Sequence, residues 1–231
     1  MFEMTLDELI LALRSGSRVA LQLRHAERPK IEPDDPTFGD SLELTEEGVR
    51  TSRELGKRLA EFKDDVRFFS SPLRRTIMTA EMVAEGMGVS DVKVPVDELL
   101  GNGSFYYTDP RVVVKVFNER EFFAACGEYY DTGILPGFVP LREAADACEQ
   151  WLMDRLNSRL LVATTHDCFI AAFLSARGVV KKFARANWPR FLDCAAIIVD
   201  PDGTRRYAFV RTGLSQGICG VSDQSRSKEG F

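Results

Sequence analysis

The sequence has few of the residues that build metal centres and disulfide frameworks. Only two histidines occur among its 231 residues, and its five cysteines form no CxxC pair. Structural zinc sites need clustered cysteine and histidine ligands, and disulfide-rich domains need an even, dense set of cysteines. We therefore expect no metal site and no disulfide framework.

Long apolar runs and an excess of basic residues are also lacking. No apolar run approaches the ~20 residues of a membrane-spanning helix. The segment 1–18 carries acidic residues where a secretory signal would carry basic ones. The formal net charge of −5 argues against a nucleic-acid partner, since such proteins usually have a basic balance. We expect a cytoplasmic protein with no membrane or nucleic-acid partner, and no feature of the sequence sets its oligomeric state.

The chain does contain an alternation of short apolar runs and amphipathic segments. The runs at 18–24, 66–69 and 160–165 predict strands, and apolar residues recur at helical spacing between them. Strands that alternate with helices predict an α/β fold, a three-layer sandwich with a mostly parallel central sheet and helices on both faces. Two further runs, 193–200 and 207–211, flank a Pro-Asp-Gly turn and predict a terminal hairpin.

The other segments predict smaller features of one domain that spans residues 1–231. A short strand is expected at 92–96 and a helix at 119–130. The irregular, aromatic-rich stretch from about 101 to 140 predicts a small inserted cap. The polar tail from about residue 215 is expected to be flexible.

Basic side chains gather where three of the predicted strands end. His25 follows the strand 18–24, with Arg24 and Arg28 beside it, and His166 follows the strand 160–165. Arg75 comes shortly after the strand 66–69. In an open α/β sheet the ends of adjacent strands converge on one crevice, where ligands bind. A phosphate-like anion would suit such a cluster, although a lone histidine is more often a structural hydrogen-bonding residue.

Three blocks of this sequence resemble signatures of the histidine phosphatase superfamily. The segment 23–29, LRHAERP, is similar to the RHG block, with Ala26 in place of its glycine. The segment 70–81, SSPLRRTIMTAE, looks like the SSPLxRAxxTAE block, and Thr165-His166-Asp167 is similar to the third block. The blocks follow the family's order and usual spacing. The resemblance covers the catalytic core and leaves out the stretch 101–140.

The resemblance implies a metal-independent phosphatase that needs no cofactor and acts on a small phosphorylated substrate. His25 would attack phosphorus as a neutral imidazole, and a backbone carbonyl would fix its tautomer. The phosphate oxygens would be held by Arg24, Arg75 and Arg28, and by His166 where it is protonated.

Two questions stay open at the level of sequence. The general acid is either Asp167, which the His-Asp pair of the acid-phosphatase branch favours modestly, or Glu98, which lies where mutase-like members carry their acid. Asp167 could instead cap a helix. The function is either phosphate monoester hydrolysis, phosphoglycerate mutase-type phosphoryl transfer, or binding of a phosphorylated ligand by a catalytically idle module.

Overall fold

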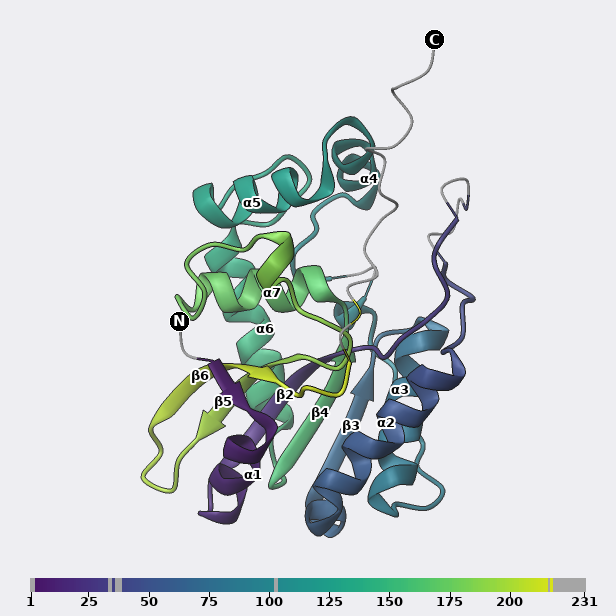
Figure 1. Cartoon of the computed structure of the whole chain (residues 1–231). Helices are drawn as coiled ribbons and strands as arrows, with labels where there is room; N and C mark the ends of the chain where they lie inside the picture. Colours follow the sequence, from purple (N-terminus) through teal and green to yellow (C-terminus); the bar gives the residue numbers. More distant parts are fainter. Residues whose placement is uncertain (1–2, 33–34, 36–38, 102–103, 216, 218–231) are drawn as a thin grey trace.

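The computed structural model describes residues 3–32, 35, 39–101, 104–215 and 217 of the chain. Six strands form one sheet in the order β1-β6-β5-β2-β4-β3 (Figure 1). They are β1 (Glu3–Thr5), β2 (Arg18–Arg24), β3 (Val66–Ser70), β4 (Leu160–Thr165), β5 (Cys194–Val199) and β6 (Arg205–Arg211). The pairs β2–β4, β3–β4 and β1–β6 are parallel, and β5 runs antiparallel to both neighbours. The protein therefore has an α/β fold with a mostly parallel sheet.

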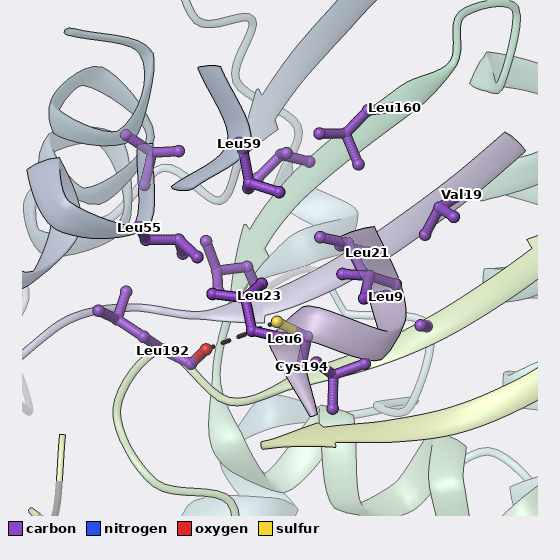
Figure 2. Packing of buried hydrophobic residues seen from close by; sticks show 14 of the residues in the cluster. Leu6, Leu9, Val19, Leu21, Leu23, Leu55, Leu59, Leu160, Leu192 and Cys194 are labelled. Carbon is purple, nitrogen blue, oxygen red and sulfur yellow. Dashed lines mark hydrogen bonds between the residues drawn. The ribbon is translucent and has the colours of Figure 1, made fainter. Parts of the chain in front are cut away.

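Helices cover both faces of the sheet. The core on one face contains apolar residues of α1 (Leu6–Arg14), α2 (Glu46–Leu59) and α3 (Arg74–Met87). The core on the other face contains residues of α6 (Leu141–Arg155) and α7 (Asp167–Ala176). Because side chains alternate along a strand, Val19 and Leu21 of β2 face the first core, while Ala20 between them faces the second. Figure 2 shows Leu6, Leu21, Leu23 and Leu59 packed together in the first core.

The start of α2 holds the loop that follows β2. Thr45 caps the helix, because its hydroxyl accepts a hydrogen bond from the Gly48 amide at 3.0 Å. The Thr45 amide in turn donates to the Glu27 carbonyl at 3.0 Å. A Cβ atom on Gly48 would lie 2.2 Å from that same carbonyl oxygen. Glycine at position 48 therefore allows the loop to approach the helix closely.

Two helices, α4 (Pro110–Glu119) and α5 (Phe122–Thr132), pack beyond α7 (Figure 1). Their core joins Val116 and Tyr129 to Phe169 and Ala172 of α7. The prediction of one helix at 119–130 is wrong at its beginning, since Glu119 is the last residue of α4. The Glu121 carboxylate starts α5 instead, by accepting a hydrogen bond from the Ala124 amide at 2.7 Å.

The segment 92–96 does not form the strand that its sequence predicts. It makes a single parallel bridge, in which Ser70 pairs with Val96. Pro95 has no N–H group, so it cannot donate to a ladder at its position. Strand β1 was not predicted, because only three residues of it pair with the sheet edge.

The predicted hairpin is confirmed, with β5 and β6 paired antiparallel. The short 3₁₀ turns are η1 (Ala60–Asp65), η2 (Glu98–Leu100) and η3 (Arg185–Asn187). The tail expected to be flexible lies outside the described residues, apart from residues 215 and 217. No helix in the described part of the chain has both the length and the apolar character needed to cross a membrane.

Candidate active site

The two histidines lie side by side at the ends of β2 and β4. The two strands pair in parallel with Arg24 opposite Thr165, so the residues that follow them leave the sheet together. The His25 amide donates to the Thr165 carbonyl at 3.1 Å. The ring centroids of His25 and His166 are 5.6 Å apart, with an angle of 64° between the ring planes.

The backbone around His25 fixes the tautomer of its ring. Nδ1 lies 2.8 Å from the carbonyl oxygen of Ala26, so it is placed to donate a proton there and to leave Nε2 as the basic nitrogen. The Ala26 amide donates to the Thr79 hydroxyl of α3 at 3.0 Å, which holds that carbonyl in place. Burial, together with the charge on Arg24, lowers the pKa of His25 well below 6.5. The ring is therefore neutral at pH 7.

The ring of His166 is half-buried and also lies among positive charges. Its Nε2 lies 3.2 Å from the hydroxyl of Ser71, and that hydroxyl is 2.7 Å from the hydroxyl of Thr76. Burial and the nearby charge of Arg75 lower the pKa of His166 well below 6.5. A neutral ring carries one N–H group, so in this state His166 can offer a hydrogen bond without a charge.

Three buried arginines surround the histidines. The exposed fractions of Arg24, Arg28 and Arg75 are 1%, 8% and 6%. Burial and the repulsion from Arg28 lower the pKa of Arg75 to about 10. The Nη1 group of Arg75 donates to the Gly39 carbonyl at 2.6 Å, while its buried Nε finds no partner among the described residues. Buried guanidinium groups are costly without an anionic partner, so the cluster is suited to bind an oxyanion.

Asp167 contributes a carboxylate to this cluster. Its Oδ2 lies 2.9 Å from Nη2 of Arg24, and its Oδ1 accepts a hydrogen bond from the Cys168 amide at 2.9 Å. Asp167 is the first residue of α7, where the helix dipole also stabilises negative charge. Both of its oxygens therefore already have a partner within the chain.

The structure does not bring the side chain of Glu98 into contact with the cluster. Glu98 is exposed on the turn η2, and its carboxylate makes no hydrogen bond or ion pair with any other described residue. The turn itself does touch the site, since the Leu100 carbonyl accepts a hydrogen bond from the Thr165 hydroxyl at 2.7 Å. Glu98 is thus an exposed residue two positions before this contact.

Sequence patterns did not reveal Phe191 and Pro189 as parts of the site. The guanidinium carbon of Arg24 lies 4.4 Å from the centroid of the Phe191 ring. The Pro189 carbonyl accepts a hydrogen bond from Nη1 of Arg24 at 2.6 Å. Both residues precede β5 and lie outside the three sequence blocks, so no pattern pointed to them. Within the described residues, no group of three or more His, Cys, Asp or Glu side chains is placed to hold a metal ion.

A family model described as histidine phosphatase superfamily (branch 1) matches residues 22–177. The matched segment contains every residue named above as a member of the cluster of histidines, arginines and Asp167. No curated protein matches the chain.

Several solved structures have a similar fold. A mutant phosphoserine phosphatase from Entamoeba histolytica, in complex with phosphoserine, has a TM-score of 0.52 and 15% identity, and the match covers 83% of this chain and 96% of that one. A mycobacterial glucosyl-3-phosphoglycerate phosphatase has a TM-score of 0.50 and 18% identity, over 84% and 97%. A phosphoglycerate mutase from Bacillus anthracis has a TM-score of 0.52 and 15% identity, over 86% and 94%.

Proposed function

The chain belongs to the histidine phosphatase superfamily, and we propose that it is a metal-independent phosphatase that hydrolyses a phosphate monoester through a phosphohistidine on His25. One observation carries the proposal: two neutral imidazoles 5.6 Å apart, among three buried guanidinium groups. The neutral ring of His25 supplies a nucleophile, and the guanidinium groups supply fixed positive charge for the phosphoryl oxygens.

The first chemical step forms a bond between nitrogen and phosphorus. The lone pair on Nε2 of His25 attacks phosphorus, and the bond from phosphorus to the ester oxygen breaks. The electron pair of that bond leaves with the alcohol oxygen, which takes a proton from a general acid. The proton on Nδ1 stays hydrogen-bonded to the Ala26 carbonyl throughout, so the modified ring keeps its orientation.

The second step is hydrolysis of the phosphohistidine. A water oxygen attacks phosphorus and loses its proton to the same carboxylate, now acting as a base, while the P–N bond breaks and its electrons return to Nε2. Inorganic phosphate leaves and His25 is neutral again. In both steps Arg24, Arg28 and Arg75 would hold the equatorial oxygens, on which negative charge is spread in the transition state.

We propose two carboxylates for the general acid, and they differ in what they must do. Asp167 lies within the cluster, but it must exchange its contact with Arg24 for one with the leaving oxygen. Glu98 has no partner among the described residues to give up, but its exposed side chain must turn inward when substrate binds. The residue that protonates the leaving oxygen is the one whose replacement slows hydrolysis of an alkyl ester more than that of an aryl ester.

The substrate class that we propose is a small phosphorylated molecule. The phosphoserine phosphatase from Entamoeba histolytica, which has a similar fold, is found in crystal structures with phosphoserine (as a mutant) and with 3-phosphoglyceric acid. Arg75 donates to the carbonyl of Gly39 in the loop after His25, and Tyr107 packs on Phe169, whose ring also contacts His166. We propose that residues of this loop and of the segment 104–140 select the group esterified to the phosphate.

The test is a screen of diverse phosphate esters with EDTA present and no metal added. We expect phosphate release from at least one ester, unaffected by EDTA and lost in His25→Ala. Isomerisation of 3-phosphoglycerate without net phosphate release would instead identify a mutase. Tight binding of phosphate without turnover of any ester would identify a catalytically idle binding module and overturn the proposal.

A further inference from the structure

A turn far from the three sequence blocks contacts both Arg24 and His25. The turn comprises residues 189–193 and leads into β5. The Pro189 carbonyl accepts a hydrogen bond from Nη1 of Arg24 at 2.6 Å, and the Asp193 carbonyl accepts one from the Arg24 amide at 3.0 Å. Between these two contacts lies the ring of Phe191.

The Phe191 ring supports the two groups that would handle phosphate. Its centroid is 4.4 Å from the guanidinium carbon of Arg24 and 5.6 Å from the centroid of the His25 ring. A guanidinium group over an aromatic face is stabilised by the ring quadrupole, more strongly when both groups are buried. Phe191 and Arg24 are each about 1% exposed. The aromatic face therefore fixes the plane of the guanidinium group.

The shape of the turn requires an unfavourable backbone conformation. Leu192 has a φ of 64°, in the left-handed region, which is unfavourable for a non-glycine residue. Its side chain is fully buried in the same core cluster as Leu6 and Leu23 (Figure 2). Burial of this leucine offsets the backbone cost, and it directs the preceding residue, Phe191, towards the site.

An ion pair between the buried Asp193 and the partly exposed Arg211 completes the turn. One carboxylate oxygen of Asp193 accepts hydrogen bonds from the Arg190 amide at 2.8 Å and from Nη1 of Arg211 at 2.7 Å. The guanidinium group of Arg211, on β6, also donates to the carbonyls of Trp188 and Asn187, at 3.1 and 2.9 Å. Asp193 and Arg211 thus tie both ends of the turn to the sheet.

We propose that Phe191 is a positioning residue, held by the Asp193–Arg211 pair, that fixes the Arg24 guanidinium group and the His25 ring for a phosphoryl group in transfer. This role rests on the proposed function, since it presupposes that Arg24 and His25 act on phosphate. Three contacts of Arg24 bear on this role: Pro189 and Asp167 accept hydrogen bonds at the edge of the guanidinium group, and Phe191 lies against its face.

The test compares Phe191→Leu with Phe173→Leu. Both substitutions replace a buried phenylalanine beneath an arginine, but Phe173 lies under Arg177 and outside the histidine cluster. The readouts are the affinity for orthovanadate, which adopts the geometry of a transferring phosphoryl group, and the ring ¹⁵N signals of His25. We expect Phe191→Leu to weaken orthovanadate binding roughly tenfold and to shift the His25 signals. Phe173→Leu should leave both unchanged.

The same readouts apply to a second variant, Arg211→Lys, which tests the proposal if Phe191→Leu does not fold. Arg211→Lys keeps the charge beside Asp193 but loses the fork that reaches two backbone carbonyls. We expect a several-fold loss of orthovanadate affinity. Wild-type affinity and unshifted His25 signals in the folded variants would overturn the proposal, as would an equal loss in Phe173→Leu.

Neither readout needs turnover, so the two proposals can fail separately. If the wild-type protein hydrolyses no ester, while Phe191→Leu still weakens orthovanadate binding and shifts the His25 signals, the proposed function fails and the positioning of the anion site stands. If hydrolysis is found and the variants bind orthovanadate as the wild type does, only the role of Phe191 is overturned.

Discussion

The imidazole rings of His25 and His166 lie 5.6 Å apart, between their centroids, because each follows a strand of one parallel pair. Backbone pairing of β2 with β4 brings the two residues together at one edge of the sheet. Arg24 precedes the first histidine and Asp167 follows the second, and Nη2 of Arg24 lies 2.9 Å from Oδ2 of Asp167.

Both histidines are expected to stay neutral in mildly acidic solution. Burial and neighbouring arginines lower the pKa of each ring well below 6.5. At pH 6 an unperturbed histidine would be about three-quarters protonated. Because the chain has only two histidines, ¹⁵N NMR of histidine-labelled protein can resolve both rings as pH is varied. A ring that titrates near 6.5 in the folded, ligand-free protein would contradict this expectation.

The same shifts predict how stability depends on pH. The unfolded chain binds protons at its histidines more tightly than the folded protein does, since the folded pKa values are lower. The contribution of these two groups to the free energy of unfolding is therefore greatest above about pH 6.5 and falls as the pH is lowered through that value. Urea denaturation between pH 5 and 8 measures the free energy of unfolding of the wild type and of His166→Gln. We expect this free energy to depend less on pH in the variant.

Replacement of Arg75 should weaken phosphate binding, whereas replacement of its neighbour should not. Arg75 is buried in the cluster, while Arg74 is exposed and pairs with Glu43 and Glu81. Loss of charge-assisted hydrogen bonds predicts that Arg75→Met raises the Kd for inorganic phosphate roughly 10- to 100-fold. Arg74→Met should stay within about twofold of the wild type, as expected for exposed ion pairs. Calorimetric titration measures the Kd of each variant, and equal increases in the two Kd values would contradict a phosphate site that contains Arg75.

The general acid can be identified by comparing leaving groups. An alkyl phosphate needs its leaving oxygen protonated, whereas an aryl phosphate with an acidic phenol does not. Loss of the acid should lower kcat/KM for an alkyl ester roughly 10²- to 10⁴-fold and change that for 4-nitrophenyl phosphate far less. Asp167→Asn and Glu98→Gln are the matched variants. The general acid is the residue whose replacement lowers kcat/KM more for the alkyl ester than for the aryl ester. Equal losses on the two esters in both variants would exclude both candidates.

Because α2 closely approaches the loop after His25, a larger side chain at Gly48 should destabilise the protein. A Cβ atom on Gly48 would lie 2.2 Å from the Glu27 carbonyl oxygen, so Gly48→Ala must displace the loop or the helix. We expect a loss of about 1–3 kcal/mol in the free energy of unfolding, together with lower affinity for phosphate. Gly127→Ala is the control, because open space surrounds its position in α5 and alanine favours a helix by roughly 0.5–1 kcal/mol. Denaturant unfolding that shows equal changes in the two variants would contradict the packing argument.

The sequence was sufficient to predict features that arise locally. The spacing of apolar residues predicted β2, β4 and their helices, and the position of polar residues at strand ends predicted the convergence of the two histidines and Arg75. Helix α4 is not among the elements that the sequence predicts, and the predicted helix 119–130 begins too early, because the capping carboxylate of Glu121 lies within an otherwise helical pattern.

The parts of the site that were missed depend on tertiary packing. Phe191 is one of sixteen phenylalanines, and only the fold places it beneath Arg24. The side-chain position of Glu98 likewise depends on where the turn η2 rests against β4. No local pattern encodes the position of either side chain, because each position depends on elements that are far apart in the chain.

The central claim is that His25 carries the phosphoryl group during turnover. The most direct measurement is rapid quenching of the enzyme with a ³²P-labelled ester that it hydrolyses, followed by identification of the labelled residue. We expect a label on His25 that is stable in alkali and labile in acid, absent from His25→Ala and present when EDTA is added. Turnover without any such label, or a label that remains when residue 25 is alanine, would contradict the account.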